Sequence, residues 1–229
     1  MNELLLLTEV IIVFSMVLLS NKLFKKEGLI AWVAIATVLA NIITAKNAVI
    51  FGLSTAIGTV MFASTFLATD ILTECYSKED AKKAVCLGLF SDVVLIVSTQ
   101  VALRYVPSAF DYANGAMQTL FALNLRISIA SAVMYFIANM ADIYLFSKLK
   151  EKTEGKYLWL RNNVSTIVCN CLENFGFIGI AFFGIYGLNT IMVIALSTSI
   201  VEMIVALLDT PFLYIAKNGA NRWLDQGKK

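Results

Sequence analysis

Nine ionisable side chains interrupt the long apolar stretches of this sequence. Eight are acids and one is an arginine, at positions Glu9, Asp70, Glu74, Asp92, Arg126, Asp142, Glu173, Glu202 and Asp209. Inside a membrane, a charged group costs roughly a few kcal/mol unless it faces a partner or a cavity. One arginine cannot neutralise eight acids, so some acids must be protonated, lie near an interface, or meet water or a cationic ligand. This excess of acids favours a solvated polar cavity.

Glu173 is the acid best placed to recognise a solute, because it lies about ten residues into its apolar stretch. Helical spacing puts Asn170 and Asn174 beside it, and Ser165 and Thr166 come one turn earlier. A polar stripe of this kind serves either hydrogen bonding between helices or solute recognition. We favour recognition.

Arg126 and Asn139, in the preceding apolar stretch, leave the same choice open. A lone arginine inside a membrane normally pairs with a carboxylate, and Glu173 and Asp70 are plausible partners. Of the remaining acids, Glu202 lies in the middle of its stretch and is hard to explain as structure alone. Glu9 lies close to the end of a plain first stretch, and we assign it no role.

Four other acids have a simpler alternative as structure near the membrane surface. Asp70 and Glu74 are four residues apart, so they share one helix face just before a basic loop, where Lys78 could neutralise them. Asp142 and Asp209 lie about one to two turns before the ends of their stretches. Both interpretations, surface structure and part of a site, stay open for these acids.

The residue types do not favour catalysis. The sequence has no histidine, which removes the commonest general base and metal ligand. Ser165 has no evident base, and the four cysteines lie in or beside apolar stretches, where they serve as small packing residues. The sequence also has no Walker P-loop motif and therefore no ATPase of its own. We expect no catalytic residue, no metal site and no cofactor.

The elements that position these side chains are membrane-spanning helices. Hydrophobic residues make up 59% of the chain and charged residues 15%, against about 25% charged in soluble domains. A helix needs roughly 20 mainly apolar residues to cross the hydrocarbon core. Seven stretches qualify, and they are 4–21, 28–45, 55–76, 82–105, 120–147, 164–187 and 189–216. The sequence thus predicts an all-α polytopic membrane protein with seven transmembrane helices and one domain.

The basic residues predict the orientation of these helices. Of the 18 lysines and arginines, 15 fall in loops on one side of the predicted membrane, two (Lys46 and Arg104) on the other, and Arg126 inside a span. Because basic loops stay in the cytoplasm, the N-terminus is predicted outside and the C-terminus inside. Acids such as Glu79 and Glu151 are mixed with the bases, so these runs are solvated loops and not a nucleic-acid-binding surface.

A weak internal repeat links the three spans that run inward. Each carries an aspartate followed by a lysine: Asp70 and Lys78, Asp142 and Lys148, Asp209 and Lys217. Repeats are common in transporters and place the binding site between them, although one aspartate and one lysine per unit could also arise by chance.

Three segments together resemble a known family. Residues 66–76 read F-L-A-T-D-I-L-T-E-C-Y, residues 158–166 read L-W-L-R-N-N-V-S-T, and residues 206–212 read A-L-L-D-T-P-F. Arg126-Ile127 with Ala130-Ser131 and Asp142 adds a fourth match. With their order and spacing, these segments are similar to signatures of the queuosine precursor transporter family, also called the vitamin uptake transporter family. The resemblance covers about residues 27–217.

The resemblance implies import of 7-deazaguanine compounds across the bacterial plasma membrane. It implies a six-helix core at 27–217, an additional N-terminal helix at 1–26, which we take as retained and not as a signal peptide, and a cytoplasmic tail at 218–229. A homo-oligomer is left open. The candidate substrate-binding residues are Asp70, Glu74, Arg126, Asn139, Asp142, Asn170, Glu173 and Glu202.

The chain departs from the family pattern at several of these positions. The family commonly has Gln at Asn139 and Asn170, Asp at Glu173, Gly at Ser77 and often Lys at Glu202. A differently shaped or more cationic ligand is therefore conceivable. Three alternatives to an independent transporter are a substrate-binding subunit of an energy-coupling-factor importer, an intramembrane enzyme, and a structural protein. The missing histidine and the number of acids count against the last two.

Overall fold

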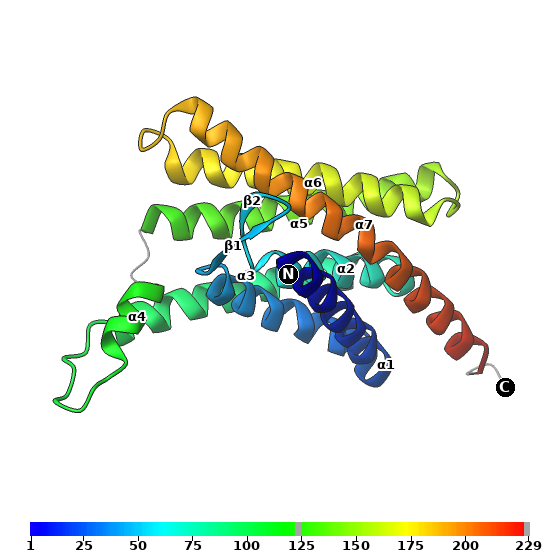
Figure 1. Cartoon of the computed structure of the whole chain (residues 1–229). Coiled ribbons are helices and arrows are strands. Elements are labelled where there is room, and N and C mark those ends of the chain that lie inside the picture. Colours follow the sequence, from blue (N-terminus) through cyan, green and yellow to red (C-terminus); the bar gives the residue numbers. More distant parts are fainter. Residues whose placement is uncertain (122–124, 227–229) are drawn as a thin grey trace.

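The computed structural model describes the backbone of residues 1–121 and 125–226, and the side chains of residues 1–121 and 127–219. Figure 1 shows one bundle of helices that lie side by side. The elements are α1 (Asn2–Ile43), β1 (Asn47–Ile50), β2 (Leu53–Ala56), α2 (Thr59–Cys75), α3 (Lys78–Ala102), α4 (Asn114–Phe121), α5 (Leu125–Lys152), α6 (Leu158–Phe182) and α7 (Leu188–Gln226).

Within the described residues, five helices are long and apolar enough to cross a membrane: α1, α3, α5, α6 and α7. Many of their large apolar side chains are exposed, among them Ile11, Phe90, Val97 and Leu172. Exposed apolar surface of this extent is typical of contact with lipid. The structure therefore confirms a polytopic helical membrane protein, while the number of seven crossings and their orientation stay predictions.

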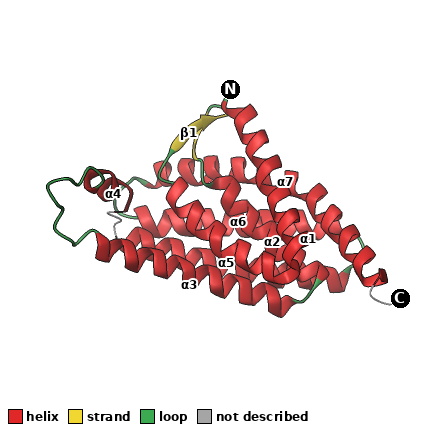
Figure 2. Ribbon diagram, turned by 90° about the horizontal axis from the view of Figure 1, so that it is seen from below, coloured by secondary structure: helices red, strands yellow, loops and turns green. Residues whose placement is uncertain are grey.

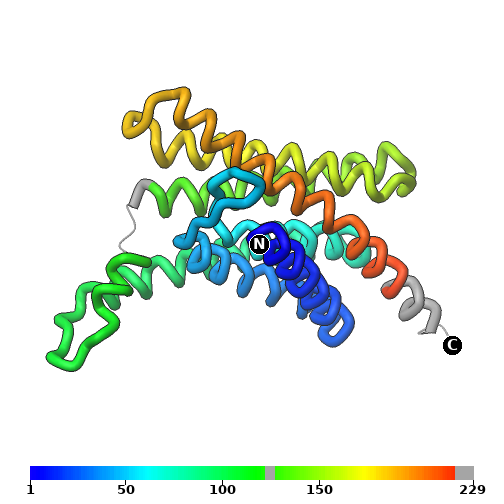
Figure 3. The backbone as a smooth tube through the Cα atoms, viewed as in Figure 1, coloured from blue at the N-terminus to red at the C-terminus, as the bar shows by residue number. Residues whose placement is uncertain are grey.

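Helix α1 contains the first two predicted spans, 4–21 and 28–45. Lys25 interrupts the helix with φ 57° and ψ −139°, and Figure 3 shows the two arms of α1 running back along each other from that turn. Gly28 permits the close approach of the arms, because a Cβ there would lie 2.5 Å from the carbonyl oxygen of Ser20.

A short β-hairpin joins α1 to α2, where only a loop and the start of a helix were expected. Phe51 and Gly52 have φ of 52° and 77°, the left-handed pair that a two-residue type I′ turn needs. Since β2 occupies residues 53–56, the span predicted at 55–76 begins later, at Thr59.

The hairpin lies against the start of the chain. Asn2 Nδ2 donates a hydrogen bond of 2.8 Å to the Val49 carbonyl, and the Phe51 N–H donates one of 3.2 Å to Glu3. Figure 2 shows the hairpin beside the N-terminus. We call this end, with α4 and the α6–α7 turn, the hairpin end. The opposite end, with the turns at 76–77 and 153–157, we call the basic end.

Several other helix boundaries also differ from prediction. Helix α5 begins at residue 125 and not at 120, because residues 114–121 form the separate helix α4. Helix α6 begins at Leu158, earlier than the predicted 164, and α7 continues through Gln226, past the predicted end at 216. Pro211 lies inside α7, where neighbouring side chains can compensate for its missing N–H group.

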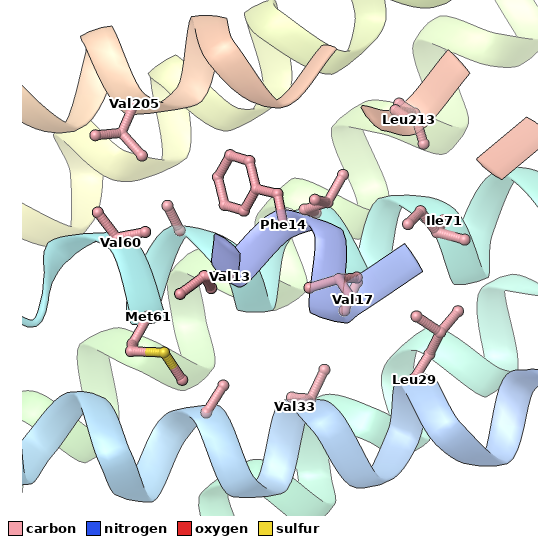
Figure 4. Close-up of a cluster of buried hydrophobic side chains, with 14 of the residues drawn as sticks. Val13, Phe14, Val17, Leu29, Val33, Val60, Met61, Ile71, Val205 and Leu213 are labelled. Carbon is pink, nitrogen blue, oxygen red and sulfur yellow. The ribbon is translucent and has the colours of Figure 1, made fainter. Parts of the chain in front are cut away.

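Helix α2 is the most enclosed element, since 14 of its 17 residues are buried. Figure 4 shows Val60 and Ile71 of α2 in one cluster of buried side chains with Phe14 of α1 and Leu213 of α7. The Phe14 ring meets Phe212 edge to face, with 5.4 Å between the ring centroids. Because α2 is surrounded by other helices, its polar side chains face protein and not lipid.

Candidate functional site

Glu74, at the basic end, binds three cations. Its Oε2 lies 2.7 Å from Arg161 Nη2 and 3.0 Å from Lys150 Nζ, and its Oε1 lies 2.7 Å from Lys217 Nζ. The Glu74 side chain is 3% exposed and that of Arg161 is fully buried. A single carboxylate thus connects α2, α5, α6 and α7.

This network corrects the expected partner of Glu74. Lys78 lies over the Tyr144 ring, 5.3 Å from its centroid, and Lys148 lies 5.6 Å from the same ring. Arg161, expected in a solvated loop, belongs to the first turn of α6 because that helix begins earlier than predicted. Spacing along α2 could not reveal cations that three other helices supply.

Three aspartates meet one level deeper in the bundle. Asp70, Asp142 and Asp209 come from α2, α5 and α7, and each is fully buried. The Asp70 and Asp142 side chains interact directly, and Asp209 lies close enough to both to interact electrostatically. The structure therefore brings together the three aspartates of the suspected repeat. Their side chains are therefore enclosed by the bundle, and whether they serve as structure or as part of a site stays open.

Helix α6 supplies the polar partners of the aspartates. Asn162 Nδ2 donates to Asp209 at 2.5 Å and to Thr210 at 3.2 Å. Thr166 Oγ1 lies 3.5 Å from Asp70 Oδ2, a long contact. Neither carboxylate oxygen of Asp142 has a hydrogen-bond donor among the described residues, although the Ser165 side chain interacts with this carboxyl group. The aspartate level thus retains unused acceptors.

Two glutamates form a further level nearer the hairpin end. Glu173 of α6 and Glu202 of α7 are each 8% exposed and interact electrostatically. Asn174 Nδ2 donates to Glu202 at 2.5 Å and to Ser199 at 3.3 Å. Glu173 Oε2 has no donor among the described residues. Glu202 is therefore already partnered, whereas Glu173 has an oxygen free to accept.

The two candidate amides are also buried with free acceptors. Asn139 donates to the Tyr135 carbonyl at 3.0 Å, and the side-chain oxygens of Asn139 and Asn170 have no partner among the described residues. A buried polar atom without a partner costs about 1–3 kcal/mol. Several such atoms lie along one path and leave acceptors that a polar ligand could use.

These levels form one path along α6. Its buried polar residues recur every three to four positions, in a stripe of Arg161, Asn162, Ser165, Thr166, Asn170, Glu173 and Asn174. At 1.5 Å per residue the stripe is roughly 20 Å long. This stripe and the side chains of α2, α5 and α7 that face it are called the polar column below. It presents mostly acceptors, which suit a solute rich in N–H donors.

Two cavities lie nearer the hairpin end. One, of about 440 Å³, is lined by the first arm of α1, the hairpin and Val201 of α7, and it includes Glu9 and Lys46. The other, of about 170 Å³, is lined by Asn41, Asp92, Phe177 and neighbouring residues. Among the candidate substrate-binding residues whose side chains are described, which leaves out Arg126, none lines either cavity.

The Arg126 side chain lies outside the described residues, so its expected pairing is not described. Sequence reasoning missed Lys150, Arg161, Asn162 and Lys217 as site residues. For Arg161 and Asn162 a signal existed, because both lie in the segment L-W-L-R-N-N-V-S-T. Asn162, eleven residues before Glu173, also shares its helical register.

Residues 56–216 match a family described as "Putative vitamin uptake transporter". The chain is 36% identical over 208 residues to the "Probable queuosine precursor transporter" of Bacillus subtilis (strain 168), covering 90% of this chain and 91% of that relative. It is 27% identical to the "Queuosine precursor transporter" of Escherichia coli (strain K12) over 133 residues, 58% of each chain. No solved structure matches the chain significantly.

Proposed function

Because the chain belongs to the vitamin uptake transporter family, we propose that it imports queuosine precursors, which are 7-deazaguanine bases, across the bacterial inner membrane. The observation that carries the proposal is the polar column, in which buried oxygens of Asp70, Asn139, Asn170 and Glu173 lack partners among the described residues. A purine-like base that offers several N–H donors complements such a row of acceptors.

The proposed topology has seven crossings, with the hairpin end outside. The crossings are the two arms of α1 and helices α2, α3, α5, α6 and α7. The distribution of basic residues, 15 on one side against two on the other, supports this orientation. Helix α2, at 17 residues, is short for a crossing, but the surrounding helices shield its ends from lipid.

Recognition is proposed to centre on a carboxylate of the column. Adjacent N–H groups of a guanine-like edge can donate two hydrogen bonds to one carboxylate, and Glu173 or Asp70 is positioned to accept them. Asn139 and Asn170 complete the pocket, whereas Arg126 lies in the first turn of α5, about 20 Å along the helix from Asn139. A ligand with an aminomethyl group carries a positive charge, for which Glu202 is the counter-charge inside the column.

The experiment is uptake of labelled 7-deazaguanines by purified full-length protein in liposomes. Glu173→Gln keeps the shape of the side chain but loses the charge. We expect uptake efficiency to fall about tenfold or more, since hydrogen bonds to charged groups contribute about 1.5–3 kcal/mol. Glu151→Gln, at an exposed position on the basic end, is the control and should transport normally. The proposal fails if wild-type protein neither binds nor transports any 7-deazaguanine.

The same liposomes test how transport is driven. Uptake without added ATPase subunits indicates a secondary transporter or facilitator, which is the mechanism we propose. Binding without uptake indicates instead a substrate-binding subunit of an energy-coupling-factor importer. In neither case do we propose an enzymatic reaction, and recovery of the ligand chemically unchanged after uptake checks that point.

A further inference from the structure

We infer that the chain has a second ligand site, outside the polar column, which captures a small aromatic ring bearing an amine. This inference rests on the proposed function. The site is the cavity of about 170 Å³ lined by the second arm of α1, α3, α4, α5 and α6. Its side chains differ from every residue considered above as part of the column.

Asp92 supplies the charge of this site. It is 2% exposed and accepts a hydrogen bond of 2.7 Å from Asn41 Nδ2. Among the side chains that the structure describes, no lysine or arginine lies within ion-pair distance of it. A buried carboxylate that faces a cavity with only one neutral donor attracts a cation.

The walls of the cavity suit an aromatic ring. Phe121 of α4 and Phe177 of α6 supply aromatic surfaces, and Thr99 and Ser128 supply hydroxyl groups. An apolar pocket with a few convergent polar groups is the usual form of a small-molecule site. A cavity of about 150 Å³ holds a benzene ring, so this one admits the aminomethyl arm of a base together with the ring that bears it.

The position of the cavity connects it to the column. Phe177 lies four residues, or one helical turn, from Glu173 on α6, so the two share a face. On α5, Ser131 of the cavity lies one turn from Tyr135, whose carbonyl accepts from Asn139. The cavity thus lies one turn nearer the hairpin end than the column, where a ligand entering from that end arrives first.

Asp92 suits this first capture better than Glu202. Each carboxylate accepts one hydrogen bond from an asparagine, Glu202 from Asn174 at 2.5 Å and Asp92 from Asn41 at 2.7 Å. Glu202 lies beside Glu173, whereas Asp92 faces a cavity. The amine is therefore bound first by Asp92, and the ring then moves towards the column.

The test uses benzylamine, a single ring with an aminomethyl arm, and its neutral analogue benzyl alcohol. Ligand-observed NMR measures their binding to full-length protein in detergent. We expect benzylamine to bind the wild-type protein. Its affinity for Asp92→Asn should be at least about tenfold lower, because a charge-assisted hydrogen bond is lost. Benzyl alcohol should change less than about twofold, since Asn keeps the size and a hydrogen bond. Glu151→Gln is the charge-matched control.

The same variants are then compared in liposome uptake of the aminomethyl and nitrile forms of 7-deazaguanine. The inference predicts that Asp92→Asn raises the half-saturating concentration of the aminomethyl form alone. An equal effect on both forms, or unchanged benzylamine binding, overturns it. If Asp92→Asn does not fold, the same binding measurement is made with Phe177→Leu. Unchanged affinity of that variant for benzylamine also overturns the proposed site. Failure of wild type to transport either base, with Asp92-dependent benzylamine binding intact, contradicts the proposed function and not the site.

Discussion

The two ends of the polar column are closed in different ways. At the basic end, one buried carboxylate meets three cations at 2.7–3.0 Å and connects four helices. At the hairpin end, a hairpin with a two-residue turn lies over the bundle, and cavities of about 440 and 170 Å³ separate the helices. The comparison indicates that the basic end is closed more tightly than the hairpin end.

The largest expected effect comes from breaking the basic end. In Arg161→Gln, the buried Glu74 loses its fully buried partner, and the Arg161 Nη1 donations to the Gly155 and Lys156 carbonyls also disappear. Removing one partner of a buried ion pair costs about 3–5 kcal/mol. We expect a loss of this size in the free energy of unfolding, measured by denaturant titration in detergent.

Lys150→Gln is the matched control for Arg161→Gln. Lys150 contacts the same Glu74 oxygen, but its side chain is 35% exposed, and partly exposed ion pairs contribute about 1 kcal/mol or less. Equal losses in the two variants would contradict the assignment of Arg161 as the central cation of the network.

A smaller effect is expected on access to the column from the basic end when Glu74 is neutralised. Cys169 is fully buried. It lies on α6 between Thr166, which contacts Asp70, and Glu173. In a chain that keeps only this cysteine, Glu74→Gln should speed its labelling by an impermeant thiol reagent from the basic end. We expect about tenfold, as for a shift of about 1.4 kcal/mol in the closing equilibrium.

Labelling from the hairpin end is the internal control for that experiment, because Glu74 lies at the opposite end. Lys217→Gln removes one of the three contacts and should give an intermediate rate. If Glu74→Gln speeds labelling equally from both sides, the network holds the fold together and is not a gate.

The smallest expected effect on transport is at the hairpin end. Gly52 has a φ of 77° with open space around it, so Gly52→Ala meets only the backbone penalty of about 1–2 kcal/mol for a left-handed residue. Gly115→Ala, also in open space but at an ordinary φ, should change stability by less than about 0.5 kcal/mol. Thermal unfolding of the two variants measures the difference. Uptake by Gly52→Ala should remain close to that of wild type if the hairpin takes no part in substrate binding or transport.

Some of this organisation was readable along the chain. Several apolar stretches are long enough to cross a bilayer as helices. They predicted a polytopic membrane protein, and the structure confirms it. The stripe from Ser165 to Asn174 was readable too, because helical periodicity fixes which residues share a face. Hairpin β1–β2 was not predicted, because β2 overlaps the start of the predicted span 55–76. Its left-handed turn also begins at Phe51, a residue type that does not indicate a positive φ.

By itself, the sequence determined which polar groups must be buried and which of them share a face, because both follow from local composition and spacing. Only the tertiary structure decided which faces meet. Asp70, Asp142 and Asp209 are each about 70 residues apart in sequence, and nothing local distinguishes a shared cluster from three separate surface acids. Likewise Lys150, not Lys148 or Lys78, reaches Glu74. The rotation and depth of each helix are set by packing over the whole bundle, which no single stretch of sequence contains.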